Sequence, residues 1–268
     1  GKTTLCEEIL PNYLTLDDDE TRLFAQSQPK GFIESFDGPQ TIDECQKAPG
    51  LFSALKLRIQ KNKRPGQFLL TGSVRFTSRK AIQESLTGRI FNLELLPLTL
   101  SEAHHLDLND FIKLSELPQH ELQLAVHRRT AKINSQHIDE YIRNGGLPGI
   151  CFLRDRSHIK NRFKAHIETL LQRDFQMVTQ TTIEYDKLLS FLKYLAVQSG
   201  LPFVISDCSR AIRMAPNTIK KTLFGFESLF LIRKLQGFGF LKKQKYFFED
   251  LGMSWYLNEP EKTDLNHF

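Results

Sequence analysis

The chain has 268 residues, of which 40% are hydrophobic and 25% charged, and its formal net charge is +5. This length predicts two domains with ample core, and the composition is that of an ordinary globular protein. No window approaches eighteen consecutive apolar residues, so the sequence predicts no membrane-spanning helix. The cysteines are widely separated, which predicts reduced thiols in a cytoplasmic protein and neither a disulfide framework nor a zinc site.

The chain opens with Gly1, Lys2, Thr3 and Thr4, which fit the second half of the phosphate-binding pattern G-x-x-x-x-G-K-[ST]. The first half of the pattern and its supporting strand would precede Gly1, so we expect a parallel sheet whose first strand is missing. In such a P-loop, Lys2 reaches the β- and γ-phosphates and the Thr3 hydroxyl coordinates Mg²⁺. The helix that begins here directs its N-terminal amides at the phosphates.

A strand predicted at 12–16 runs into the acidic segment 17–20, which predicts a helix start. A second, short strand is predicted directly before Asp43 and Glu44. Adjacent carboxylates there can hold Mg²⁺ and polarise an attacking water. Because the segment 39–41 is Pro-Gln-Thr where a buried parallel strand favours apolar residues, we expect this strand to be weak.

A more apolar strand at 67–70 leads into Thr71, Gly72 and Ser73. Either Thr71 or Ser73 is suited to contact a γ-phosphate. Ligands of open α/β sheets bind beyond the carboxyl ends of the strands, so we expect all these polar side chains at one crevice.

Several runs of sequence, in this order, together resemble one family: 41–49, 51–55, 64–73, 84–90 and 93–98. They are similar to the prokaryotic AAA-type ATPases of the STAND-like group, whose P-loop domain is fused to a conserved C-terminal domain of unknown function. The segments 141–148 and 248–252 look like that C-terminal partner. The resemblance therefore covers nearly the whole chain.

The resemblance implies ATP and Mg²⁺ as cofactors and assigns three sets of residues. The nucleotide-binding residues would be Gly1, Lys2, Thr3, Thr4, Thr71 and Ser73. The metal ligands would be Thr3 and Asp43, and the catalytic residues would be Glu44 and Arg89. For Arg89 two interpretations stay open: it stabilises charge on the γ-phosphate, in cis or from a neighbouring subunit, or it is a surface arginine before a strand.

After residue 100 the sequence becomes more helical. A helical stretch is predicted from Ser101 to about Asn144, and the segment 145–148, Gly-Gly-Leu-Pro, is a firm break. A long helix is then predicted at 155–176 from its three- and four-residue apolar spacing. We interpret 103–184 as a helical lid and linker that follow an ATPase core at 1–102.

The segment 185–248 predicts a winged helix-turn-helix. The expected order is a helix ended by Gly200, a strand at 202–205, helices at 207–213 and 218–228, and strands at 229–235 and 245–248. Ser206 or Asp207 is expected to cap the second helix and Asn217 the third. In this fold the third helix enters the DNA major groove. The DNA-contacting residues would be Asn217, Thr218, Lys220 and Lys221, with Lys242 and Lys243 from the wing.

Charge supports a contact with double-stranded DNA. Residues 200–250 hold nine Lys and Arg against four Asp and Glu, an excess equal to that of the whole chain. Winged helices also serve as protein-docking or intramolecular modules, and this alternative stays open. The segment 249–268 is interpreted as the start of a further module, and it lacks the carboxylate and lysine set that nuclease chemistry requires.

The sequence thus predicts Mg²⁺-dependent ATP hydrolysis coupled to rearrangement of a winged-helix domain, with a homo-oligomer or protein partner and no membrane. Two alternatives remain: a DNA-binding protein with a vestigial nucleotide site, and an ATP-gated scaffold with little turnover. A small-molecule kinase is disfavoured, because the adjacent pair Asp43 and Glu44 suits water activation better than activation of a substrate hydroxyl.

Overall fold

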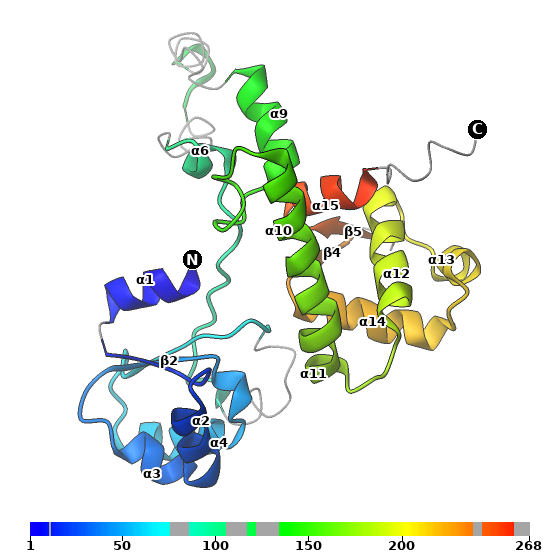
Figure 1. The fold of residues 1–268 in the computed structure, drawn as a ribbon. Coiled ribbons are helices and arrows are strands. Elements are labelled where there is room, and N and C mark those ends of the chain that lie inside the picture. The colour runs from blue at the N-terminus through cyan, green and yellow to red at the C-terminus, as the bar shows by residue number, and fades with distance from the viewer. Residues whose placement is uncertain (11, 76–85, 106–116, 122–133, 238–242, 260–268) are drawn as a thin grey trace, which may run out of the picture. The chain divides into compact units, whose positions relative to one another are not determined.

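The computed structural model of the chain describes residues 1–10, 12–75, 86–105, 117–121, 134–237 and 243–259 (Figure 1). The chain divides into two compact units. The first consists of Gly1–Leu95 with Ser228–Phe230, and the second of Leu96–Glu227 with Leu231–Phe268.

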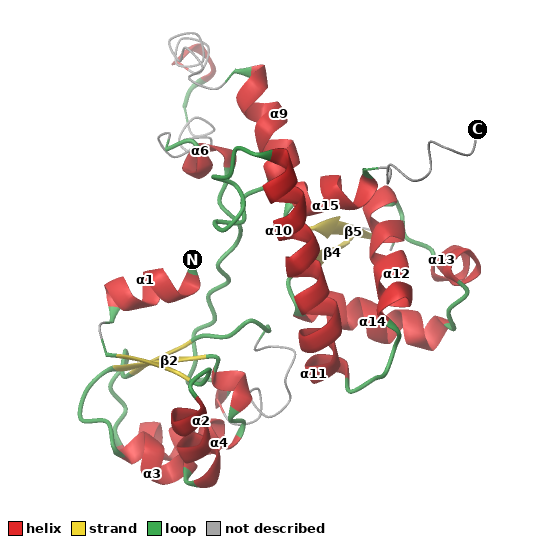
Figure 2. Ribbon diagram, viewed as in Figure 1, coloured by secondary structure: helices red, strands yellow, loops and turns green. Residues whose placement is uncertain are grey.

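The first unit contains a three-stranded parallel sheet in the order β1-β2-β3. Its strands are β1 (Tyr13–Thr15), β2 (Gln40–Asp43) and β3 (Phe68–Leu70). The remaining elements are α1 (Lys2–Ile9), α2 (Asp19–Ser27), α3 (Pro29–Glu34), the 3₁₀ turn η1 (Cys45–Lys47) and α4 (Gly50–Lys61). Helices α2, α3 and α4 cover one face of the sheet, and α1 lies over the other (Figure 2).

The two faces of β2 serve different purposes. Ile42 points into the apolar core together with Phe32 and Phe52, and all three are almost completely buried. Side chains alternate along a strand, so Asp43 lies on the opposite face, toward α1. The core therefore fixes the strand that presents Asp43.

The prediction of a weak strand before Asp43 is wrong for Gln40 and Thr41. All four residues of β2 are buried, and the strand pairs with a neighbour on each side. The polar side chain of Gln40 is accommodated because its amide donates to the backbone oxygens of Asn12 and Thr41, at 2.9 and 3.0 Å. A buried polar group that is hydrogen-bonded carries little penalty.

The second unit is mainly helical. Its helices are α6 (Leu100–Ala103), α9 (Ser135–Asn144), α10 (Arg156–Thr169), the π-helical turn η3 (Leu170–Asp174), α11 (Phe175–Thr179), α12 (Tyr185–Val197), α13 (Ile205–Ile212), α14 (Pro216–Ser228) and α15 (Leu251–Asn258). Strands β4 (Ile232–Gln236) and β5 (Gln244–Phe248) form an antiparallel hairpin, with Ile232 opposite Phe248. No helix among the described residues is long and apolar enough to cross a membrane.

The long helix predicted at 155–176 is confirmed. Asp155 caps it by accepting from the backbone N–H of His158 at 2.9 Å, and α10, η3 and α11 then run on continuously to Thr179 (Figure 1). Of the helical stretch predicted at 101–144, α6 and α9 are observed, whereas 106–116 and 122–133 lie outside the described residues.

Two predicted helix starts are wrong. Helix α13 begins at Ile205 after Val204, so Ser206 and Asp207 lie inside it and neither caps it. Helix α14 begins at Pro216, which places Asn217 in its first turn. Proline suits the first helical position, since its φ is already helical and the missing N–H would be unpaired there.

The predicted strands of this region are shorter than expected. The strand at 202–205 is reduced to a single antiparallel bridge between Pro202 and Lys245. The strand predicted from 229 begins only at Ile232, because α14 continues to Ser228 and Phe230 then adopts a left-handed φ of 56°.

Candidate active site

The start of α1 and the ends of β2 and β3 meet in the first unit. The Lys2 ammonium donates to the backbone oxygen of Gly72 at 2.9 Å, beyond the end of β3. The Thr3 hydroxyl lies 3.5 Å from Oδ2 of Asp43, the last residue of β2. The polar side chains that the sequence predicts at one crevice thus lie together, on the face of the sheet that α1 covers.

Asp43 is held from two sides. Its Oδ1 accepts from the Thr71 hydroxyl and from the Glu44 N–H at 3.0 Å, and its Oδ2 accepts from the Tyr13 hydroxyl at 2.5 Å. The Asp43 side chain is buried, so this set of donors replaces the water that the carboxylate loses. Its orientation is therefore fixed by a donor on β1, by the next backbone N–H and by the residue that follows β3.

Sequence reasoning missed Tyr13. Burial of the phenol, and secondarily its hydrogen bond to Asp43, raises the pKa of Tyr13 to about 12. The register pairs Tyr13 with Thr41 and Thr15 with Asp43, which puts these side chains on one face. Aligning the two strands in parallel, with side chains alternating between the two faces, would have placed Tyr13 on the same face as Asp43.

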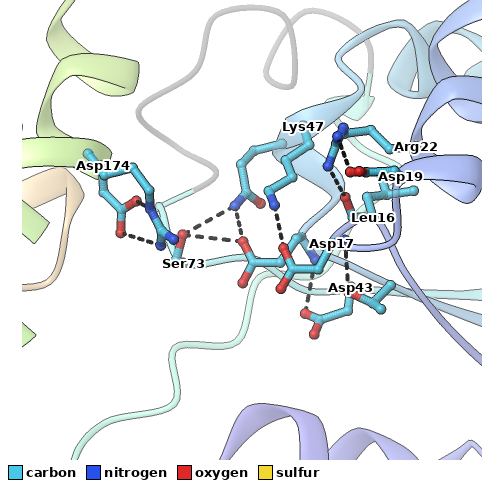
Figure 3. A network of polar contacts seen from close by, with 12 residues as sticks. Leu16, Asp17, Asp19, Arg22, Asp43, Lys47, Ser73 and Asp174 are labelled. Carbon is cyan, nitrogen blue, oxygen red and sulfur yellow. Dashed lines mark hydrogen bonds and ion pairs between the residues drawn. The ribbon is translucent and has the colours of Figure 1, made fainter. Parts of the chain in front are cut away.

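Glu44 follows Asp43 in a left-handed backbone conformation, with φ 52°. Its carboxylate oxygen Oε2 accepts from the Gln46 amide and from the Ser73 hydroxyl at 3.4 Å. The same Gln46 amide lies 3.2 Å from the Ser73 oxygen, and these contacts are drawn as dashed lines around Ser73 in Figure 3. Sequence reasoning missed Gln46 as well.

A second group of charges anchors the turn that carries Gln46. Lys47 forms an ion pair with Asp17 (Figure 3). The backbone oxygen of Lys47 accepts from Gln26 at 2.7 Å. Asp19 pairs with Arg22 within α2. The Lys47–Asp17 pair ties the turn that carries Gln46 to the segment after β1, whereas the Asp19–Arg22 pair is local to α2.

Not every predicted site residue joins this cluster. Thr4 is exposed on α1. Arg89 is exposed, its guanidinium donates to the Thr87 oxygen at 3.3 Å, and it makes no hydrogen bond to the cluster within the described part of the chain.

The cluster around Asp43 fits Mg²⁺. One carboxylate oxygen and one hydroxyl oxygen, from Asp43 and Thr3, approach each other, and hard oxygen ligands are those that Mg²⁺ prefers. Within the described residues there is no group of three or more His, Cys, Asp or Glu that could hold a metal ion. Magnesium is commonly bound through one or two carboxylates together with substrate phosphates, which matches this sparse set.

The residues predicted to contact DNA lie in the second unit. Asn217, Lys220 and Lys221 are exposed on α14, and Thr218 is partly exposed there. Lys243 is exposed just before β5, whereas Lys242 lies outside the described residues.

Comparisons with known proteins match the two ends of the chain separately. Residues 1–104 match the family model of an AAA domain, and residues 135–263 match that of a domain of unknown function. The first segment is therefore similar to AAA domains, in agreement with the resemblance seen in the sequence.

Similar whole proteins are distant. Two uncharacterized proteins, one from Mycobacterium bovis and one from Mycobacterium tuberculosis, are each 24% identical over 217 residues, which is 81% of this chain. The chain spans 42% of the length of each of these relatives. A Walker-type ATPase of Pyrococcus abyssi has 14% identity and a TM-score of 0.43, over 86% of this chain and 66% of that structure.

Proposed function

We propose that this chain binds ATP with Mg²⁺ and hydrolyses it at the cluster around Asp43. The observation that supports the proposal is the meeting of Lys2 and Thr3, at the start of α1, with Asp43, Thr71 and the backbone beyond β3. An AAA-type domain provides the general setting for this chemistry.

Each residue has a distinct role in the proposed reaction. Lys2 and the first amides of α1 hold the phosphates, and Thr3 and Asp43 would hold Mg²⁺. When bound, the metal neutralises charge on the phosphoryl oxygens. Glu44 orients the attacking water or takes its proton, and Thr71 or Ser73 contacts the γ-phosphate.

The position of Lys2 agrees with this role. Its ammonium donates to the neutral Gly72 oxygen, which lies next to Ser73. A phosphate oxygen is a stronger acceptor for a cation than a carbonyl, because the hydrogen bond is charge-assisted on both sides. Lys2 would therefore exchange this carbonyl for phosphate when nucleotide binds.

The test is Mg²⁺-dependent phosphate release, measured on a chain in which the P-loop pattern is completed upstream of Gly1. We expect Lys2→Ala to abolish nucleotide binding and turnover. Glu44→Gln should lower kcat by about 10²- to 10⁴-fold, the usual contribution of a general base, while ATP still binds. Lys30→Ala, an exposed lysine on α3, is the matched control and should retain full activity.

The outcomes separate the alternatives. Binding of ATP with negligible turnover, unaffected by Glu44→Gln, would instead support an ATP-gated scaffold. Failure of the parent chain to bind ATP would leave the nucleotide site vestigial.

A second candidate function is DNA binding by the second unit. We propose that α12, α13, α14 and the hairpin β4–β5 form a winged helix-turn-helix. The specific observation in its favour is that Asn217, Lys220 and Lys221 share the exposed surface of α14. Rearrangement of this region with ATP turnover, and self-association or a protein partner, belong to the same proposal.

The DNA proposal is tested with fluorescence anisotropy on a labelled duplex. The double variant Lys220→Ala/Lys221→Ala should weaken binding by about tenfold or more, since each lysine neutralises a phosphate. Lys160→Ala/Lys187→Ala, which removes two exposed lysines from α10 and α12, is the charge-matched control. Equal weakening by both pairs would contradict a specific role for α14.

A further inference from the structure

We infer that Gln46 is a positioning residue that holds the Glu44 carboxylate in place for water activation. The inference rests on the proposed function, because it assigns a partner to the proposed base. It is carried by the contacts of Glu44, Gln46 and Ser73.

The contacts on Glu44 are one-sided. The Gln46 amide and the Ser73 hydroxyl both approach Oε2 of the carboxylate, and no hydrogen bond from a described residue reaches Oε1. A general base needs one oxygen within hydrogen-bond reach of its water. Two donors on Oε2 fix the plane of the carboxylate while leaving Oε1 available.

The backbone restricts Glu44 further. Its φ of 52° lies in the left-handed region, which non-glycine residues rarely adopt and which is concentrated at functional sites. The Cys45 N–H donates to the Thr71 oxygen at 3.1 Å, so the turn after Glu44 is tied to the end of β3. The carboxylate is thereby set beside the proposed γ-phosphate contacts, Thr71 and Ser73.

Gln46 itself is well fixed. It lies two residues after Glu44 in η1, with a relative exposure of only 7%. Its amide bridges Glu44 and Ser73, which come from the ends of β2 and β3. A buried side chain that links two strand ends has little rotational freedom, so it can hold Glu44 without being displaced by solvent.

The test is Gln46→Met, which keeps the length of the side chain and removes its N–H donors. Steady-state kinetics on the chain with the completed P-loop should show a kcat lowered about ten- to a hundredfold, with KM for ATP and the affinity for a non-hydrolysable ATP analogue unchanged. Combined with Glu44→Gln, the substitution should cause no further loss of kcat, because the proposed effect of Gln46 on turnover passes through the Glu44 carboxylate.

Two further variants keep the test decisive. Gln46→Glu has nearly the same shape and replaces the donor with a second carboxylate, so it should lower kcat in the same way if Gln46→Met fails to fold. Gln67→Met removes a glutamine amide that donates to the Asn62 and Arg64 oxygens before β3, at the opposite end of that strand from Ser73, and it should retain the parent kcat.

Turnover that survives both Gln46 substitutions but is lost in Glu44→Gln would overturn the inference and leave the proposed function intact. A fall in analogue affinity together with kcat, or an additive loss in the Glu44→Gln background, would also overturn it and indicate a structural role. Activity that does not depend on Glu44 would instead contradict the proposed function.

Discussion

His166 on α10 links the stability of the second unit to pH. Burial lowers the pKa of this imidazole, and the charge of Asp174 opposes that effect only in part. The folded state therefore binds a proton less readily than the unfolded chain. The stability that depends on the neutral imidazole is fully present above its unfolded pKa, near 6.5, and is lost as the pH falls below it.

We expect the free energy of unfolding of the wild-type protein to decrease between pH 7 and pH 5 more steeply than that of His166→Gln. The limiting slope for one proton is about 1.4 kcal/mol per pH unit. Trp255, the single tryptophan, lies in the same structural unit as His166. Urea unfolding followed by its fluorescence therefore measures this dependence on pH.

The comparison with the variant is needed because Asp250 titrates with the opposite sign. Burial raises the pKa of this carboxyl, against the hydrogen bonds from nearby backbone N–H groups, so its contribution to stability falls as the pH rises above its unfolded value. Asp250 is present in both proteins, so its effect cancels in the difference. Parallel curves for wild type and His166→Gln would show that His166 does not contribute.

At the scale of elements, the junction after α9 is closely packed. Gly145 ends α9 with a φ of 68°, which favours glycine, and the Gly146 N–H donates to Asp250 at 2.7 Å. Asp250 also caps α15 by accepting from the Met253 N–H at 2.8 Å. A Cβ added at Gly146 would overlap the backbone oxygen of Leu98. One turn thus joins three segments that are far apart in sequence.

We expect Gly146→Ala to lower the free energy of unfolding of the second unit by about 1–3 kcal/mol, as overpacking of a close contact does. Gly149→Ala is the matched control: it lies three residues away in the same loop, has open space around its Cβ position, and should stay within about 0.5 kcal/mol of wild type. Trp255 fluorescence during urea unfolding reports both variants. Equal stability of the two would contradict the packing argument.

The element-level predictions succeeded where the signal was local. The acidic run before α2 predicted its start, and Asp18 does cap this helix by accepting from the Thr21 N–H at 2.8 Å. The break after α9 followed from its glycines. The caps predicted for α13 and α14 were wrong, because a hydroxyl or carboxyl near a helix start can lie one or two residues inside it, and Pro216 sets the start of α14 instead.

At the scale of the whole molecule, positive charge is concentrated in one region. Residues 200–250 carry nine basic and four acidic residues, against a net charge of +5 for the entire chain. Some of the basic residues are neutralised locally, since Arg233 pairs with Glu249 and Arg210 with Asp207. The lysines of α14 are exposed, and they account for the proposed DNA affinity.

We expect the logarithm of DNA affinity to fall linearly with the logarithm of salt concentration, because bound lysines release counterions. Lys220→Ala/Lys221→Ala should reduce this slope by about two, one for each lost phosphate contact. Anisotropy titrations from low to physiological salt measure the slope. An unchanged slope would place the phosphate contacts elsewhere on the chain.

The sequence by itself predicted the similarity of the first segment to AAA domains, which the family comparison confirms, and named most residues of the proposed nucleotide site. Lys2, Thr3, Asp43, Glu44, Thr71 and Ser73 could be named because each follows a local pattern at a helix start or a strand end. Only the tertiary structure decided which side chains hold them. Tyr13 reaches Asp43 because the parallel register of β1 and β2 puts both side chains on one face. Gln46 reaches Glu44 because the chain turns at Glu44, whose backbone is left-handed. Those contacts depend on packing between segments, which a local pattern does not record.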